Sequence, residues 1–255
     1  DKSPVKSGLI SSWHLKQKLA NFAQCVALMM VPPPSKNRVL FRLRTLTGLL
    51  HINLNQSIDF QVGLEGSMIK KYLETDRIFL REFVIGDELN LLDLDSDPEV
   101  MAFLSDGRPS TLEEANAGLG KICALYEKHQ HRLGFWVAIE KSSDQFMGWF
   151  LLRPCKLHPD NLREIELGYR LKKNFWGKGY ATEMSNALID KGFMEFDLDT
   201  IFAKTMKLNS ASQNVMRKVG MLFENDFEEN DFPGKNKEAV RFSITRTRWN
   251  NLKSF

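Results

Sequence analysis

The feature that most constrains this chain is a strand–loop–helix–strand series between residues 164 and 207. EIELGYRL (164–171) and TIFAKTMK (200–207) have the apolar and β-branched content of strands, and apolar residues recur at helical spacing from Gly179 to about Lys191. Two strands that are joined through a helix run parallel and form a right-handed crossover. The series therefore predicts one βαβ unit inside a sheet, with the loop NFWGKGY at its turn.

The elements on either side predict a mixed sheet. Upstream, we expect strands at 77–83, 134–140 and 146–153. Between the first two of these strands we expect a helix at 86–104, interrupted around residues 96–98, and a second helix from Ser110 to about His129 with Glu113 as its capping acid. Downstream, we expect a helix at 210–219 that ends at Gly220, and strands at 221–226 and 239–249. The fold class is α/β (α+β), with a mostly antiparallel sheet, one parallel crossover and flanking helices.

Charge and patterning divide the chain near residue 68. Residues 1–67 contain eight Lys or Arg against three Asp or Glu, a net charge of +5, which leaves 27 against 29 for residues 68–255. We predict a basic, poorly patterned N-terminal extension (1–67) and one patterned domain (68–255). Within the extension, 16–30 favours a helix and 39–43 a strand, and one expectation is that the natural domain starts near Met68.

Composition excludes several classes of protein. The three cysteines form no C-x-x-C pair, so neither a disulfide framework nor a zinc site is indicated, and we expect a reducing, cytoplasmic location. No apolar run reaches the about 18 residues that a membrane span requires, so no membrane partner is expected. The five histidines lack ligand spacing, so no metal is expected. The net charge of +3 does not favour nucleic acid, although the basic extension leaves such a partner as a rival interpretation.

The loop Gly177-Lys178-Gly179 combines a glycine turn with a helix N-terminus. Free backbone N–H groups and the helix dipole favour a phosphate there, although the same glycines also suit a tight turn without any ligand. A P-loop is excluded, because no G-x-x-x-x-G-K-[ST] string is present. A dinucleotide is disfavoured, because Thr182 replaces the third glycine and no acid ends the strand at 200–207.

Two spaced motifs resemble those of the GCN5-related N-acetyltransferase (GNAT) superfamily and, within it, the RimJ/RimL-like branch. NFWGKG (174–179) resembles the family's [Q/R]-x-x-G-x-[G/A] loop, with Asn174 at the Gln or Arg position, and NSASQNVMRKVGM (209–221) resembles its N-x-x-S-x-x-[V/L]-x-x-K-x-G-[F/M] motif. LETDRIFLREF (73–83), DPEVMAFL (97–104) and GWFLL (148–152) also resemble the branch. The resemblance covers about residues 73–250 and implies the GNAT fold with acetyl-CoA as co-substrate.

The resemblance also implies a cofactor site. The pyrophosphate would lie on backbone N–H groups of Trp176, Gly177, Lys178, Gly179, Tyr180 and Ala181. The pantetheine amides would pair with the end of the strand at Tyr169, Arg170 and Leu171. Asn209 would contact the pantetheine arm, and Ser212 would contact it and hydrogen-bond or protonate the sulfur. Many relatives carry a tyrosine acid four residues after that serine, but Met216 occupies the position here.

Glu166 is the candidate general base, because EIELGY resembles the branch's A-E-I-G-Y pattern and a carboxylate there can take a proton from an amine, through water. Glu164 shares its face of the strand and is the alternative base, and an ordinary strand glutamate is the competing interpretation. Asp106 and Arg108 lie in a loop that borders the acceptor site in relatives, or in a solvated turn. Glu183 is interpreted as a structural acid in the first turn of its helix.

These features together predict an acetyl-CoA-dependent N-acetyltransferase. It would transfer the acetyl group to a primary amine, on a protein N-terminus or a small molecule, by direct attack in a ternary complex. The alternative function is a GNAT-fold domain that binds acyl-CoA without turnover, as a sensor or scaffold. A homodimer is left open, and the sequence does not identify the acceptor.

Overall fold

The structure is a computed structural model that describes residues 42–45, 48–51, 71–84, 86–104 and 108–254. The chain divides into two compact units, residues 1–66 and 67–255. In the first unit, the described residues form one antiparallel pair of strands, β1 (Arg42–Thr45) and β2 (Gly48–His51). The helix expected at 16–30 lies outside the described residues, and the strand expected at 39–43 overlaps β1 only at its last two residues.

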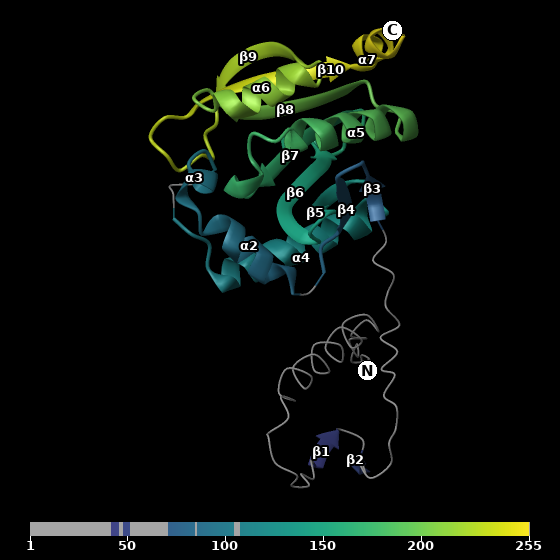
Figure 1. Cartoon of the computed structure of the whole chain (residues 1–255), viewed down its shortest axis with the longest axis vertical. Helices are drawn as coiled ribbons and strands as arrows, with labels where there is room; N and C mark the ends of the chain where they lie inside the picture. The colour runs from purple at the N-terminus through teal and green to yellow at the C-terminus, as the bar shows by residue number, and fades with distance from the viewer. Residues whose placement is uncertain (1–41, 46–47, 52–70, 85, 105–107, 255) are drawn as a thin grey trace, which may run out of the picture. The chain divides into compact units, whose positions relative to one another are not determined.

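An eight-stranded sheet forms the centre of the second unit (Figure 1). Its strands are β3 (Lys71–Glu74), β4 (Ile78–Glu82), β5 (Gly134–Glu140), β6 (Gln145–Pro154), β7 (Glu164–Leu171), β8 (Thr200–Met206), β9 (Leu222–Glu228) and β10 (Glu238–Thr245). Their order across the sheet is β3-β4-β5-β6-β7-β8-β10-β9, and every neighbouring pair is antiparallel except β7 with β8. The mixed, mostly antiparallel sheet with one crossover is therefore confirmed.

The helices pack on the two faces of this sheet. They are α2 (Asp87–Asp95), α3 (Pro98–Met101), α4 (Leu112–Lys128), α5 (Tyr180–Glu195), α6 (Ser210–Lys218) and α7 (Arg246–Lys253). The larger apolar cluster joins Met184 of α5 and Met216 of α6 to strand residues such as Phe150. A smaller cluster joins Leu94 of α2 and Leu119 of α4 to the other face, and Figure 1 shows both of these helices beside β5 and β6. None of the described helices has the length and apolar character needed to cross a membrane.

The chain's last strand is shorter than the sequence predicted. The strand expected to run through Trp249 ends at Thr245, whose Oγ1 caps α7 by accepting a hydrogen bond from the Arg248 backbone N–H at 3.3 Å. The Arg246 guanidinium donates at 2.8 Å to each of three carbonyl groups between residues 193 and 198, at the end of α5. These contacts join segments about 50 residues apart, so the alternation of residues 239–249 could not indicate the end of the strand.

The start of α4 also differs from the prediction by one residue. Thr111, rather than Ser110, is the N-cap residue, and its Oγ1 accepts a hydrogen bond from the Glu114 backbone N–H. Glu114, rather than Glu113, completes the capping box by accepting from the Thr111 backbone N–H at 2.7 Å. The Ser110 hydroxyl donates instead to Asp95 of α2 at 2.6 Å, so tertiary contact decided which hydroxyl caps the helix.

The backbone of β7 leaves no room for a side chain at Gly148 of β6. The φ of Gly148 is +139°, and an added Cβ would lie 2.0 Å from the Arg170 carbonyl oxygen. The ladder between β5 and β6 shifts register beside it, between Ala138 and Ile139. Only glycine fits here, next to the end of β7 that carries the predicted site residues.

We expect Gly148→Ala to lower the free energy of unfolding by about 3 kcal/mol, because the new methyl group would displace the backbone of β7. Equilibrium unfolding in urea measures the change. Gly120→Ala is the matched control, since Gly120 is exposed in the middle of α4 and its Cβ would meet nothing within 4 Å. The control should gain about 0.5–1 kcal/mol. Wild-type stability for Gly148→Ala would contradict the close approach.

Candidate active site

β7 and β8 separate after three paired residues. The parallel ladder joins Glu164–Glu166 to Thr200–Phe202, after which β7 continues to Leu171 paired with β6, and β8 continues to Met206 paired with β10. We call the region between residues 167–171 and 203–206 the β7–β8 opening. Backbone groups of β7 that face it lack a ladder partner, and such a strand edge can pair with the amides of an extended ligand. Residues 169–171, which the resemblance assigns to the pantetheine amides, thus lie in the part of β7 that is not paired with β8.

The glycine loop lies at the carboxyl end of β7. A short 3₁₀ turn (Lys173–Phe175) leads to Gly177 and Gly179, whose φ values are +73° and +84°. Gly179 is the N-cap of α5, which has no side-chain cap, so the first N–H groups of the helix keep no side-chain acceptor. A Cβ on Gly177 would meet nothing within 4 Å, so there is open space beside the loop. Free N–H groups at a helix N-terminus favour an anion.

Arg77, in the turn just before β4, holds this loop. Its Nη1 donates to the Lys178 carbonyl oxygen at 3.0 Å, its Nε donates to Glu183 Oε2 at 2.6 Å, and its guanidinium lies 4.3 Å from the centroid of the Tyr180 ring. Burial raises the pKa of the Glu183 carboxyl, but hydrogen bonds from Thr75 and Arg77 outweigh it and hold this pKa below its ordinary value. Glu183 therefore has the contacts of a structural acid, whereas the role of Arg77 was not predicted.

Asn209 and Ser212 lie at the start of α6, and Ser212 contacts Tyr169 of β7. Asn209 is the N-cap, and its Oδ1 accepts a hydrogen bond from the Ser212 backbone N–H at 3.1 Å. The Ser212 Oγ lies 3.1 Å from the Tyr169 hydroxyl oxygen. Burial raises the pKa of Tyr169 to about 12, although the hydrogen bond with Ser212 opposes the shift. Three residues that the sequence indicated separately thus meet at the β7–β8 opening.

The candidate base Glu166 lies at the last position where β7 pairs with β8. Its side chain is 8% exposed, and its Oε2 accepts a hydrogen bond from Arg153 Nε at 2.8 Å, with Arg153 Nη2 2.7 Å away. Among the residues that the structure describes, no hydrogen bond reaches Oε1. Glu164, on the same face, is paired with Arg241. Arg153 is opposite Glu166 in the β6–β7 ladder, so its contact follows from a register that the sequence did not supply.

The side chains of the other loop residues contact the protein itself. Trp176 Nε1 donates to the Leu171 carbonyl oxygen at 2.7 Å, and the Tyr180 hydroxyl donates to Glu140. Lys178 Nζ lies 5.9 Å from the centroid of the Phe175 ring. Ala181 packs against the larger apolar cluster. The predicted anion site thus depends on backbone N–H groups from Gly177 to Ala181 rather than on these side chains, because the Trp176 N–H donates to the Lys173 carbonyl oxygen at 3.0 Å.

Arg170 and Arg108 make contacts that the sequence did not predict. Arg170 Nη1 donates to Asp95 of α2, and burial lowers the pKa of Arg170 while Asp95 opposes the shift. Arg108 Nη2 donates to Glu114 Oε1 at 2.7 Å. Asp106 lies outside the described residues. In the described parts of the chain, no group of three or more His, Cys, Asp or Glu is arranged to hold a metal ion.

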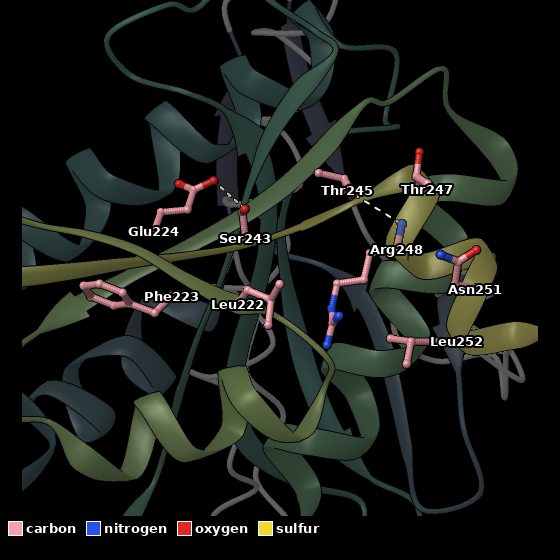
Figure 2. A pocket seen from close by; sticks show the side chains of 9 residues that line it. All are labelled: Leu222, Phe223, Glu224, Ser243, Thr245, Thr247, Arg248, Asn251 and Leu252. Atoms are coloured by element: carbon pink, nitrogen blue, oxygen red, sulfur yellow. Dashed lines mark hydrogen bonds between the residues drawn. The ribbon is translucent and has the colours of Figure 1, made fainter.

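A pocket of about 510 Å³ lies elsewhere, between β9, β10 and α7 (Figure 2). Its lining includes Leu222, Phe223, Arg248 and Leu252. Glu224 and Ser243, which also line it, are hydrogen-bonded to each other, as Figure 2 shows. In the sheet order β7-β8-β10-β9, these strands lie beyond β8, so the pocket is separate from the β7–β8 opening.

Comparisons with known proteins agree with one another. A family model described as an acetyltransferase (GNAT) domain matches residues 77–222. The FsC-acetyl coenzyme A-N(2)-transacetylase of Aspergillus fumigatus is 34% identical over 163 residues, which cover 61% of this chain and 68% of that protein.

Two solved structures show the same fold at lower sequence identity. RimL, a ribosomal L7/L12 alpha-N-protein acetyltransferase in complex with coenzyme A, has a TM-score of 0.58 at 14% identity, and the match covers 67% of this chain and 95% of that one. The spermidine N-acetyltransferase of Vibrio cholerae, in complex with CoA and spermine, has a TM-score of 0.55 at 19% identity, over 69% and 100% of the two chains.

We expect Arg153→Ala to lower the free energy of unfolding by about 3 kcal/mol, because it leaves the Glu166 carboxylate buried without its partner. Urea unfolding at neutral pH measures the loss. Arg163→Ala is the control: Arg163 is also ion-paired, with Asp197 and Asp199, but its side chain is 54% exposed. Solvent screens such pairs, so the control should lose much less stability. Equal losses in the two variants would refute a desolvated Glu166–Arg153 pair.

Proposed function

The chain belongs to the acetyltransferase (GNAT) family and is an N-acetyltransferase; on that premise, we propose that it transfers an acetyl group from acetyl-CoA to a primary amine by direct attack in a ternary complex. The observation that carries the proposal is the β7–β8 opening beside a glycine loop at an uncapped helix N-terminus. An unpaired strand edge and a set of free N–H groups suit a ligand that has both amides and phosphates.

The residues present fit this co-substrate. Backbone N–H groups from Gly177 to Ala181 would hold the pyrophosphate, since the Trp176 N–H already donates to the Lys173 carbonyl oxygen at 3.0 Å. The edge of β7 at Tyr169–Leu171 would pair with the pantetheine amides. The two left-handed glycines keep side chains away from the phosphates. Acetyl-CoA supplies a thioester, which is already activated toward an amine. The protein then has to orient the amine and manage two protons.

Glu166 and Ser212 are the proposed catalytic residues. As the carbon–nitrogen bond forms, the Oε1 atom of Glu166 accepts the proton of the amine, through water. As the carbon–sulfur bond breaks, its electron pair leaves with the sulfur, and the Ser212 hydroxyl donates a hydrogen bond to that atom. Asn209 supports this arrangement, because its side chain fixes the Ser212 backbone.

The acceptor is a primary amine on a protein N-terminus or a small molecule. Structural neighbours include enzymes for a ribosomal protein and for spermidine, and the Aspergillus fumigatus relative is named an N(2)-transacetylase. A screen for CoA release over N-terminal peptides, amino acids, polyamines and aminoglycosides tests the proposal. Binding of acetyl-CoA with no CoA release for any amine would favour the alternative, a sensor or scaffold without turnover.

We expect Glu166→Gln to lower kcat by about 100-fold or more with the best amine of that screen, because the amide cannot accept the proton. The dissociation constant for acetyl-CoA, measured by calorimetry, should stay within about twofold, since Glu166 contacts no part of the proposed cofactor site. Asp190→Asn, which alters an ion-paired carboxylate on α5, is the control and should keep wild-type kcat. A large loss in Glu164→Gln, with none in Glu166→Gln, would move the base to Glu164.

The glycine loop gives a separate prediction. Gly177→Val and Gly179→Val should each weaken acetyl-CoA binding more than about tenfold, because a β-branched residue cannot adopt a left-handed φ without moving the N–H groups. Lys178→Ala should weaken binding only about two- to threefold, because its side chain adds one exposed charge. Calorimetric titration measures all three variants, with Gly120→Ala as the control. Intact affinity in both valine variants would refute the pyrophosphate site.

A further inference from the structure

One side-chain contact links β7 to α6 at the β7–β8 opening. The Tyr169 hydroxyl oxygen lies 3.1 Å from Ser212 Oγ and 3.4 Å from the Ser212 carbonyl oxygen. The two residues are 43 positions apart in the sequence. The only role that the sequence suggested for Tyr169 was a backbone contact with the pantetheine arm.

Both partners of this contact are held in place by other residues. Asn209 fixes the Ser212 backbone N–H at 3.1 Å. The Tyr169 ring packs against Phe150, with 5.7 Å between the ring centroids, and against the larger apolar cluster. A phenol hydroxyl in such surroundings needs a partner, because an unpaired buried donor is costly. Ser212 is the partner that the described structure provides.

The site benefits if Tyr169 is the donor and Ser212 Oγ the acceptor in this hydrogen bond. Burial raises the pKa of Tyr169 to about 12, so the phenol keeps its proton over the working range of an enzyme. When Tyr169 donates to Ser212 Oγ, the serine hydrogen is free for a second acceptor. Without Tyr169, the Ser212 hydroxyl group loses the partner that fixes its orientation.

Met216 cannot supply the hydrogen bond that the departing sulfur needs, so another group must. It lies one turn after Ser212, is only 3% exposed and belongs to the larger apolar cluster. A thioether inside the core cannot donate a hydrogen bond to a departing sulfur. The neighbouring hydroxyl groups of Ser212 and Tyr169, which are 3.1 Å apart at this end of α6, can both act as donors.

We propose that Tyr169 is a positioning residue of the acyl-transfer site, whose hydroxyl group holds Ser212 so that the serine O–H points at the departing sulfur of the thioester. The inference rests on the proposed function and deepens it. Tyr169 acts through Ser212 and stabilises the negative charge that develops on sulfur as the carbon–sulfur bond breaks. It exchanges no proton with the substrate.

A double-mutant cycle tests this coupling. Tyr169→Phe and Ser212→Ala should each lower kcat by roughly 10- to 100-fold, while the dissociation constant for acetyl-CoA stays within about threefold. Tyr169→Phe in the Ser212→Ala background should cost nothing further, because the serine through which it acts is gone. Ser212→Thr keeps the hydroxyl group and should retain most of the wild-type kcat.

Tyr72→Phe is the matched control for losing a partly buried tyrosine hydroxyl. Tyr72 lies on β3, at the edge of the sheet, and its hydroxyl group donates to the Arg132 carbonyl oxygen at 2.8 Å. Because β3 is far from β7 in the sheet order, the loss of this hydroxyl group should leave kcat unchanged. Thermal unfolding reports whether each variant is folded. If Tyr169→Phe does not fold, the comparison of Ser212→Thr with Ser212→Ala still tests the hydroxyl donor on which the proposal depends.

Three results would overturn the proposal. The first is wild-type kcat in Tyr169→Phe. The second is a double variant whose loss equals the product of the single losses, which would mean that Tyr169 does not act through Ser212. The third is equal loss in Ser212→Thr and Ser212→Ala. If the wild-type protein releases no CoA with any amine of the panel, the proposed function is overturned, and this inference with it.

Discussion

The early end of the pairing between β7 and β8 is the constraint on which the rest of the site depends. The parallel ladder stops at Glu166 and Phe202, and each strand then continues with only its other neighbour. Had the ladder continued, every backbone group of residues 167–171 that faces β8 would have a partner and no ligand could bind there. The opening also brings the N-termini of α5 and α6 to the same region, because each helix is connected to the carboxyl end of one of the two strands.

Different interactions hold the two sides of this opening. On the α5 side, the Arg77 guanidinium bonds to the Lys178 carbonyl oxygen and to Glu183, so the loop keeps its shape while its own N–H groups stay available. On the α6 side, Asn209 and Tyr169 fix Ser212 from two directions. The site is thus organised by polar contacts between distant segments, and the core beneath it is apolar. Such preorganisation reduces the reorganisation that catalysis requires.

The local sequence was sufficient to predict most elements and the residues with a local signature. β5 and β7 begin and end at the expected residues, because alternation bounded by polar turns defines strands of that length. The glycine loop and the start of α6 were also predictable, since a left-handed φ restricts residue type and a helix needs a cap. The contacts of Arg77, Arg153 and Arg246 were not predictable, because each partner lies 13 to 106 residues away.

By itself, the sequence determined the fold class, the crossover and the place of the glycine loop, because each follows from periodicity or from backbone freedom within a few residues. Only the tertiary structure decided that β7 and β8 part after three residues, that Glu166 is paired with Arg153 and that Tyr169 reaches Ser212. Those features depend on sheet register and on packing between segments, and long side chains can meet any partner that the fold brings within reach.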